Sequence, residues 1–407
     1  MKILFIHEVS YRTKFVFEMH EFPELLALRG DEVSFLEFPE DDSSWQFKKR
    51  VGSQRIGGRA HPEASINLIT PSSFGKGIIG RLFGVFSAIP ALKNELKLNR
   101  PDVIVLLAVP TSGWQTVRIA KQLNIPVVFR ALDVSHLLRP TVFSGLIKYA
   151  EKYIYKNATV LTANNPALTK YCVELSRREG PSLVNLPPLD LSHFEGKLEK
   201  SILKKYGIPF EARVLMYMGT FFRFSGLEQA LRDFAVQLKT HNDLYFVLVG
   251  QGEIEVQLRD LAQKLDISDH IIFTGRIDYL QLGEILRAAD IALNPFDSEF
   301  LTNVALPHKV LQYMATGVPV VSTNLEGLKG VVGESSGVTW VEPGASHIDA
   351  AIKLLNSPKE NRHKMGVVQQ QTIEELLNLD RILDDFIDTL RLAVERNKLG
   401  EMYDKRF

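Results

Sequence analysis

The sequence is poor in cysteine and has no long apolar run. Its 407 residues include a single cysteine, Cys172, which excludes an intrachain disulfide and a metal site built on cysteines. One cysteine also suits a reducing cytoplasm. No stretch approaches the roughly 18 apolar residues of a membrane-spanning helix, and the start, MKILFIHEVS, lacks the apolar core and cleavage site of a signal peptide. We therefore expect a cytoplasmic protein.

An excess of one charge is also missing. The chain has 48 basic and 48 acidic residues, so its net charge is zero, which argues against a nucleic-acid partner. The two halves differ, because residues 1–190 hold 24 basic and 18 acidic residues whereas the remainder holds 24 basic and 30 acidic ones. The basic first half predicts an anionic surface or an anionic acceptor as its partner.

Length and pattern indicate two α/β domains. A chain of 407 residues with 45% hydrophobic and 24% charged residues has room for two globular cores. Strand-like runs alternate with helical ones, which predicts doubly wound parallel sheets. The region 180–200, with three prolines and a charged end, predicts the domain boundary, and residues 41–73 predict a basic loop. The expected strands are 2–7, 32–38, 103–107, 126–130, 159–162, 214–218, 244–249, 271–274, 291–295, 318–322 and 339–341.

The stretch 290–323 predicts a strand, a loop, a helix that begins near Pro307, and a buried strand. A helix N-terminus that follows a parallel strand favours phosphate. Lys309 adds a charge in the first turn, and Gln312 shares its face of the helix. The pattern therefore predicts a site for a phosphate and a sugar hydroxyl; the alternative is an ordinary buried unit with a solvated Lys309.

The same stretch resembles a known family. It is similar to the donor site of family 4 glycosyltransferases of the GT-B fold, in the version Pro-x-Lys-Leu-x-Glu-Tyr-Met-Ala-x-Gly-x-Pro-Val-Val. The matching positions are Pro307, Lys309, Tyr313, Met314, Ala315, Gly317, Pro319, Val320 and Val321. The two glutamates of the family motif fall on Val304 and Gln312, and the amide of Gln312 accepts hydrogen bonds without a charge.

The resemblance implies an architecture and a reaction. Two Rossmann-like domains would face each other across a cleft, with residues 1–190 binding the acceptor and 200–375 the nucleotide sugar. Residues 376–407 would form a helical segment packing back on the first domain. The family transfers sugar with retention of configuration and needs neither metal nor cofactor. We expect a nucleotide-diphosphate sugar, above all a UDP-sugar, and a glycan or lipid-linked acceptor in polysaccharide or glycolipid synthesis.

Several donor-binding residues are implied by the resemblance. Gly219 would let a phosphate approach the backbone. The basic residues of the family's turn fall on Thr220 and Ser225, so Arg223 is expected to substitute for them. The other expected donor contacts are Gly250, Arg276, Asn303, Val304, Ala305, Leu306, Lys309 and Gln312.

Two sites in the first half are candidates for substrate contact and chemistry. His7 follows the first strand, where ligands bind in open α/β sheets, and no G-x-G-x-x-G follows it, which counts against a nicotinamide cofactor. Asp133 and His136 follow the strand 126–130 and are candidate acid–base groups. Asp133 is the preferred base; the alternative is a turn cap and a structural histidine.

The segment 78–91 has two interpretations. Its apolar residues and the neighbouring Lys76, Arg81, Lys93 and Lys97 are typical of a helix on an anionic membrane surface, whereas a core helix is the alternative. The first interpretation predicts weak peripheral attachment to the inner face of the plasma membrane. Two other functions stay open: an epimerase-like or catalytically weak relative of the same fold, and a two-domain ligand-binding protein.

Overall fold

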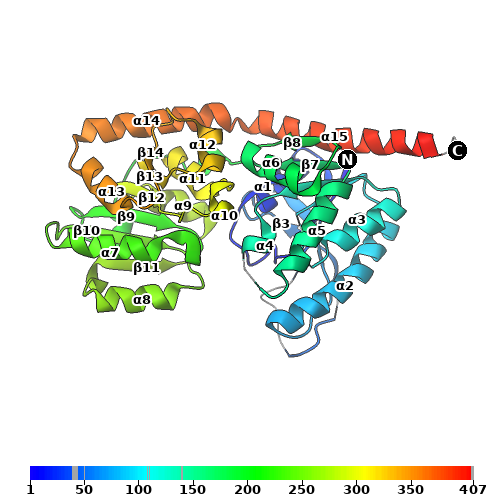
Figure 1. Ribbon diagram of the computed structural model, residues 1–407, viewed down its shortest axis with the longest axis horizontal. Helices are drawn as coiled ribbons and strands as arrows, with labels where there is room; N and C mark the ends of the chain where they lie inside the picture. The colour runs from blue at the N-terminus through cyan, green and yellow to red at the C-terminus, as the bar shows by residue number, and fades with distance from the viewer. Residues whose placement is uncertain (39–44, 50, 108, 110, 139–140, 405–407) are drawn as a thin grey trace. The chain divides into compact units, whose positions relative to one another are not determined.

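The computed structural model describes residues 1–38, 45–49, 51–107, 109, 111–138 and 141–404. The chain forms two compact units (Figure 1). The first unit comprises Met1–Pro188 and Leu379–Phe407, and the second comprises Leu189–Asn378. Each unit is built on its own, mostly parallel sheet.

The first unit has a sheet in the order β3-β4-β2-β1-β5-β6-β7-β8. All neighbouring strands among the described residues pair in parallel except β3 and β4, which form an antiparallel pair. The strands are β1 (Lys2–Ile6), β2 (Glu32–Leu36), β3 (Val51–Gly57), β4 (Ser65–Thr70), β5 (Val103–Leu106), β6 (Val127–Ala131), β7 (Val160–Ala163) and β8 (Ser182–Val184).

One expectation about the first unit is wrong. Residues 41–73 are not only loop, because they contain β3 and β4; residues 41–44 and 50 lie outside the described residues. β3 is an edge strand with exposed polar side chains, so it lacks an apolar pattern. The boundary region 180–200 contains β8, a short strand that completes the sheet.

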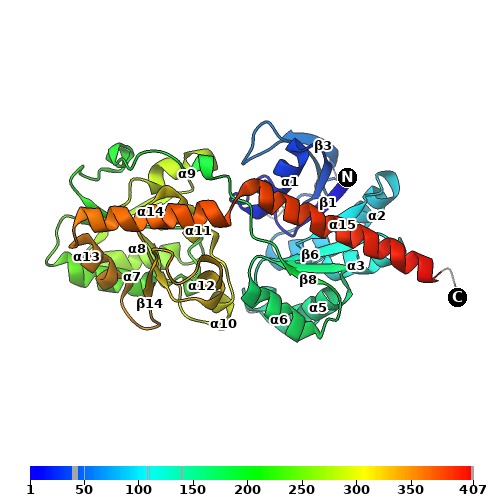
Figure 2. The same cartoon turned by 90° about the horizontal axis from the view of Figure 1, so that it is seen from above.

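Helices cover both faces of the first sheet. One face is packed by α1 (Glu18–Leu28) and α15 (Leu379–Asp404), the helix that ends the chain (Figure 2). Phe386 of α15 stacks on Phe22 with 4.0 Å between ring centroids, and Leu383 and Leu390 are buried beside it. The helices on the other face are α2 (Gly77–Leu98), α3 (Gly113–Gln122), α5 (Ser144–Asn157) and α6 (Pro166–Ser176), and the short α4 (Ser135–Leu138) precedes α5.

The second unit has a parallel sheet in the order β11-β10-β9-β12-β13-β14. Its strands are β9 (Arg213–Met218), β10 (Leu244–Val249), β11 (Ile271–Gly275), β12 (Ile291–Asn294), β13 (Val320–Thr323) and β14 (Thr339–Val341). The side chains of β9, β10, β12 and β13 are almost all buried, as expected of strands covered on both faces, whereas most of those on the outer strands β11 and β14 are half-buried. Short 3₁₀ turns are η1 (Leu191–His193), η2 (Ser201–Tyr206), η3 (Arg223–Ser225) and η4 (Ser268–His270).

Two groups of helices enclose the second sheet (Figure 1). α7 (Leu227–Leu238), α8 (Glu255–Lys264) and α13 (His347–Leu355) pack on one face. The other face carries α9 (Tyr279–Leu286), α11 (His308–Thr316), α12 (Glu326–Val332) and α14 (Lys359–Leu376). The loop expected at 296–306 contains a single helical turn, α10 (Phe300–Asn303), which its polar sequence does not indicate.

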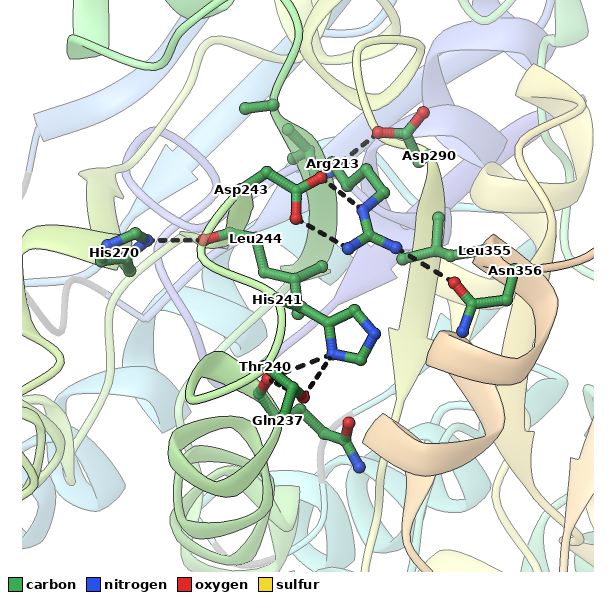
Figure 3. A network of polar contacts seen from close by, with 12 residues as sticks. Arg213, Gln237, Thr240, His241, Asp243, Leu244, His270, Asp290, Leu355 and Asn356 are labelled. Atoms are coloured by element: carbon green, nitrogen blue, oxygen red, sulfur yellow. Dashed lines mark hydrogen bonds and ion pairs between the residues drawn. The ribbon is translucent and has the colours of Figure 1, made fainter.

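A polar network holds the amino-terminal edge of the second sheet (Figure 3). Arg213, at the start of β9, donates two hydrogen bonds to Asp243 at 2.6 and 2.7 Å and a third to Asn356 at 3.2 Å. The hydrogen bond from Arg213 lowers the pKa of Asp243. Because these side chains form hydrogen bonds with one another, the amino-terminal edge has a structural role. We therefore expect ligands at the opposite edge, where the strands have their carboxyl ends.

A buried ion pair joins the first helix to the first sheet. The guanidinium of Arg130, on β6, contacts the carboxylate of Glu18, in the first turn of α1, with Nε 2.7 Å from Oε2. The side chains are 1% and 2% exposed. Arg130 also donates to the carbonyl of Asn185 at 2.8 Å. A buried pair of this kind is costly to break because the remaining charge has no solvent.

We expect the Glu18→Ala variant to lose roughly 3–5 kcal/mol of unfolding free energy, because Arg130 would remain as a buried, uncompensated charge. Urea unfolding monitored by circular dichroism measures the change. The exposed Glu32→Ala variant is the control and should change stability by less than about 0.5 kcal/mol. Equal effects of the two substitutions would show that the buried pair is not a determinant of stability.

Candidate functional site

The second unit has a topological switch beside β9. The chain passes from β9 outward to β10 and β11, and then returns to place β12 on the other side of β9. In open parallel sheets, ligands bind beyond the carboxyl ends of the strands at such a point. Gly219 directly follows β9 and Pro295 follows β12, so the loops that begin there frame the expected site.

Lys309 fills the centre of this region. It is the second residue of α11 and only 9% exposed. Its Nζ lies 3.9 Å from the ring centroid of Tyr217 and 4.0 Å from that of Phe296, and it has no hydrogen-bond partner among the residues that the structure describes. Burial lowers the pKa of this amine well below its ordinary value. The alternative of a solvated Lys309 is therefore wrong, and an anionic ligand would satisfy the amine.

Glycines bring the loops after β9, β10 and β11 close to one another, and the first of these loops lies beside the amine. Gly219 has a φ of +139°, and a Cβ there would lie 3.3 Å from Lys309 Nζ. Gly250 has a φ of +125°, and a Cβ on it would lie 2.2 Å from the Gly219 carbonyl oxygen. The Gly250 amide donates to the Gly275 carbonyl at 2.9 Å. The absence of these side chains lets backbone, and hence a bound group, approach the lysine.

The predicted basic contacts lie further out. The Arg223 side chain is 88% exposed, with Nε 3.9 Å from the Glu253 carboxylate. Arg276 is exposed, and Gln251, with its amide oxygen turned toward it, accepts two of its N–H groups at 3.1 Å. Thr220 accepts a hydrogen bond from the Tyr217 hydroxyl through its carbonyl, at 3.0 Å. The structure thus brings together Gly219, Gly250 and Lys309, and it leaves the Arg223 guanidinium in solvent.

The loop before α11 supports the fold around the site. The Asn303 side chain accepts from the Glu326 amide at 3.1 Å, which fixes the first turn of α12. Val304 and Leu306 are buried, and a Cβ on Gly327 would lie 2.5 Å from the Ala305 carbonyl oxygen. These four residues of the predicted site therefore pack against α12 or the core.

α11 is fixed to β9 next to the lysine. The Tyr313 hydroxyl accepts a hydrogen bond from the Met218 amide at 2.5 Å. Gln312, the other predicted residue of this helix, lies one turn after Lys309 and is also buried. Sequence reasoning missed Tyr217 and Phe296; the available signal was an aromatic residue at or just after the ends of the strands that flank the switch.

In the first unit, an internal carboxylate occupies the corresponding switch between β1 and β5. Glu8 is buried, and it accepts hydrogen bonds from the amides of Thr111 at 2.5 Å and Ser112 at 3.2 Å, at the start of α3. The Nδ1 of His7 accepts from the Glu8 amide at 2.8 Å. Burial, followed by the charge of Lys14, lowers the pKa of His7 to about 3, so His7 is neutral at physiological pH.

One strand further along, Asp133 and His136 lie after β6 with a partner that the sequence did not indicate. The Nδ1 of His136 lies 2.6 Å from Oε2 of Glu151, a buried residue of α5. Burial, followed by the charge of Glu151, raises the pKa of Asp133 to about 6. Burial also raises the pKa of Glu151 to about 7 and lowers that of His136. Arg139 and Pro140, at the end of the predicted loop, lie outside the described residues.

Residues 199–371 match the family model described as "Glycosyl transferases group 1". The chain is 23% identical over 270 residues to N-acetyl-alpha-D-glucosaminyl L-malate synthase of Bacillus anthracis, which covers 66% of this chain and 68% of that protein. It is 24% identical over 270 residues to alpha-monoglucosyldiacylglycerol synthase of Streptococcus pneumoniae, covering 62% of this chain and 59% of that protein.

Solved structures resemble almost the whole chain. Sucrose-phosphate synthase of Thermosynechococcus elongatus superimposes with a TM-score of 0.77 at 16% identity, covering 96% of this chain and 98% of that one. HepE of Anabaena, solved in complex with UDP, gives a TM-score of 0.70 at 14% identity, covering 96% of this chain and 100% of that one. At these identities the likeness establishes the fold, which is GT-B, as the sequence predicted.

We expect the Lys309→Met variant to be more stable than the wild-type protein by roughly 1–3 kcal/mol, because it removes a buried amine without a hydrogen-bond partner. The gain should shrink as the pH rises. Lys309 binds its proton more tightly in the unfolded chain than in the folded chain. The stability of the wild-type protein therefore increases as the pH rises toward the ordinary pKa of lysine.

Urea unfolding in neutral and alkaline buffer measures both effects. The exposed Lys239→Met substitution is the matched control, because it removes the same charge from the surface, at the residue that follows α7. A loss of stability in Lys309→Met, or the same gain in the control, would contradict the interpretation of Lys309 as a destabilised site residue.

Proposed function

Since this protein is a glycosyltransferase with the GT-B fold and a glycosyl transferases group 1 domain at residues 199–371, we propose that it transfers a sugar from a UDP-sugar to a lipid-linked or glycan acceptor. The second unit binds the donor and the first unit binds the acceptor. The anomeric configuration of the sugar is retained, and no metal or cofactor takes part. The product belongs to polysaccharide or glycolipid synthesis.

The observation that carries this proposal is the amine of Lys309 at the switch point of the second sheet, which has no hydrogen-bond partner in the part of the chain that the structure describes. A diphosphate is the part of a nucleotide sugar that requires positive charge, and here it meets Lys309, the N-terminus of α11 and the backbone beside Gly219. HepE, a structural relative, binds UDP. Arg223 supplies charge only if its exposed side chain turns inward on binding.

The mechanism follows from where the charges lie. As the bond between the sugar carbon and the diphosphate breaks, negative charge develops on the leaving phosphate, and Lys309 stabilises it in a site with little water. The acceptor oxygen forms the new bond on the same face of the sugar and gives up its proton. Asp133 and His136, after β6 of the first unit, are the candidate groups to receive that proton.

A lipid-linked acceptor is favoured by the surface of the first unit. One side of α2 packs into the core through Ala88, Leu92 and Leu96, so the core-helix interpretation holds for that side. The other side exposes Ile79, Leu82 and Phe86 to 50%, 53% and 73%, and Trp45 and Phe47 are exposed as well. An apolar surface with basic neighbours is typical of proteins that rest on anionic membranes.

Among the described residues, no helix is both long enough and apolar enough to span a membrane. The proposed membrane contact is peripheral, through the exposed side of α2 and the exposed basic residues Lys76 and Lys93. The diacylglycerol in the name of a relative is consistent with an acceptor that lies in a membrane.

The direct test is to incubate the protein with a panel of nucleotide sugars and detect released nucleotide and modified acceptor lipid by mass spectrometry. We expect UDP release with transfer of the sugar. Lys309→Met should weaken UDP binding at least about tenfold in calorimetry, since a charge-assisted contact contributes roughly 1.5–3 kcal/mol. Lys239→Met, which removes the same charge from an exposed position, is the matched control and should bind UDP as well as the wild type.

Unchanged UDP affinity in Lys309→Met would remove the lysine from the donor site. An epimerised nucleotide sugar, without any transfer, would instead favour the epimerase-like alternative. Binding of a sugar without turnover of any nucleotide sugar would favour a ligand-binding protein.

Liposome co-sedimentation tests the acceptor surface. We expect the protein to pellet with anionic but not neutral vesicles, and to be released at high salt, because each basic residue at such a surface contributes about 1 kcal/mol. Lys76→Glu with Lys93→Glu should abolish pelleting. Arg232→Glu with Lys239→Glu, on α7 of the second unit, changes the charge equally and should not. Failure to pellet at low salt would leave a soluble acceptor as the remaining choice.

A further inference from the structure

We propose that Tyr217 and Phe296 are positioning residues for the donor: while the site is empty, their ring faces hold the charged amine of Lys309 at the switch point, so that a diphosphate can bind to it directly. We call these two residues the aromatic pair. The inference rests on the proposed function for the identity of the ligand. All three residues belong to the second unit, and the sequence did not indicate either ring.

The first argument is the geometry around the amine. The Nζ of Lys309 lies 3.9 Å from the ring centroid of Tyr217 and 4.0 Å from that of Phe296. Both distances are well inside the roughly 6 Å within which an aromatic face attracts a cation. The rings come from different segments, because Tyr217 lies in β9 and Phe296 follows β12. Residues from both sides of the switch point therefore hold the amine.

The second argument is the kind of partner that the amine has. Burial of an ammonium group is costly unless another group compensates for the lost water, and Lys309 is only 9% exposed. Its Nζ has no hydrogen-bond partner among the described residues, so the aromatic pair provides the compensation. Lys200, in the same unit, shows the usual arrangement, since its Nζ lies 2.6 Å from a carboxylate oxygen of Asp290.

This difference between the two lysines has a consequence for binding. An internal carboxylate would occupy the N–H groups of a site lysine, and the diphosphate would have to displace it. A ring face attracts the charge without accepting a directed hydrogen bond from one N–H group, so all three donors of the lysine remain available. The aromatic pair thus keeps the amine of Lys309 ready for an anion.

The third argument is that the rings are themselves held in place. Tyr217 is fully buried, and its hydroxyl donates to the Thr220 carbonyl at 3.0 Å. Phe296 is half-buried, its ring lies edge-on to that of Phe224 with centroids 5.5 Å apart, and its carbonyl accepts from the Thr323 hydroxyl at 2.6 Å. Because both rings are already fixed, less side-chain entropy is lost when the ligand binds.

Burial and the aromatic pair have opposite effects on the charge of the amine. Burial lowers the pKa of Lys309, whereas a ring face stabilises only the charged form and so opposes this shift. Tyr217 and Tyr313 supply no charge, because burial raises the pKa of each hydroxyl. Burial, followed by the charges of two acidic neighbours, raises the pKa of Asp297, the residue after the second ring. Removing a ring should therefore lower the pKa of Lys309 further.

The decisive variant is Phe296→Leu, which keeps an apolar side chain and removes the ring face. We expect the pKa of Lys309 to fall further. Because the diphosphate binds the charged amine, we also expect the UDP dissociation constant in mildly alkaline buffer to rise roughly tenfold, the scale of a cation–ring contact in a desolvated site. Phe296→Tyr keeps the ring and should bind UDP within about twofold of the wild type.

Phe273→Leu is the matched control. Phe273 is a half-buried residue of β11, and its ring contacts a different cation, with Cζ of Arg259 4.0 Å from the ring centroid. The substitution removes the same kind of contact at a distance from Lys309. It should change neither the pKa of Lys309 nor the affinity for UDP.

The pKa is measured by carbon NMR on protein with lysine labelled at Cε, and the Lys309 signal is assigned by its loss in Lys309→Met. Calorimetry measures UDP affinity, and its repetition in buffers with different heats of ionisation counts the protons taken up on binding. A lower pKa of Lys309 predicts a larger proton uptake in Phe296→Leu than in the wild type. The NMR titration is made on folded protein, so a loss of stability in the variant does not change its outcome.

The proposal requires both changes in Phe296→Leu. An unchanged pKa of Lys309 with weaker UDP binding would overturn it and make Phe296 a direct contact of the nucleotide. A lower pKa with unchanged UDP affinity would leave the rings a structural role only, and equal losses of affinity in Phe296→Leu and Phe296→Tyr would show that the ring is not the cause. If the wild-type protein binds no UDP, the proposed function fails, whereas the NMR titration still decides whether the aromatic pair holds the amine.

Discussion

Parallel pairing of buried strands is the constraint on which both halves of this protein depend. Side chains of β9 and β12 are enclosed on both faces, so a polar group has room only at the ends of the strands. Lys309 reaches that edge from α11, and it is held by aromatic rings from both sides of the switch point. Because the fold surrounds the amine with aromatic rings, it has no hydrogen-bond partner among the described residues, and this makes the position suitable for an anion.

Much of the architecture could be predicted because buried strands and amphipathic helices have distinct periods. In α11 the apolar residues that recur at helical spacing, Val310, Leu311 and Met314, are all buried, as that period indicates. The failures have a common cause. β3 is a polar edge strand, β8 spans only Ser182–Val184, and α10 and α12 are too short to show a period. Their existence is decided by pairing and packing with distant segments.

The candidate sites could be predicted in part, because ligands bind beyond the carboxyl ends of parallel strands. Lys309, Gly219 and Gly250 were expected near one another and lie together. The sequence could not show which side chains meet in three dimensions, because Tyr217 and Phe296 approach Lys309 from separate strands. Glu151 did leave a signal: an acidic residue stands between Ile147 and Ile154 on the inward side of a helix. Its partner, His136, depends on how α4 turns back on α5.

The carboxylate of Glu8 makes the two similar folds unequal. In each unit a helix begins beside the strand at the switch point, but in the first unit the amides of Thr111 and Ser112 are already bonded to Glu8. The side chain acts as a built-in counter-ion, and it occupies the place at which a phosphate would otherwise compete for these amides. One acidic residue thus makes the two switch points unequal: in the first unit the helix N-terminus is already bonded to Glu8, whereas the second unit places the amine of Lys309 beside its switch point.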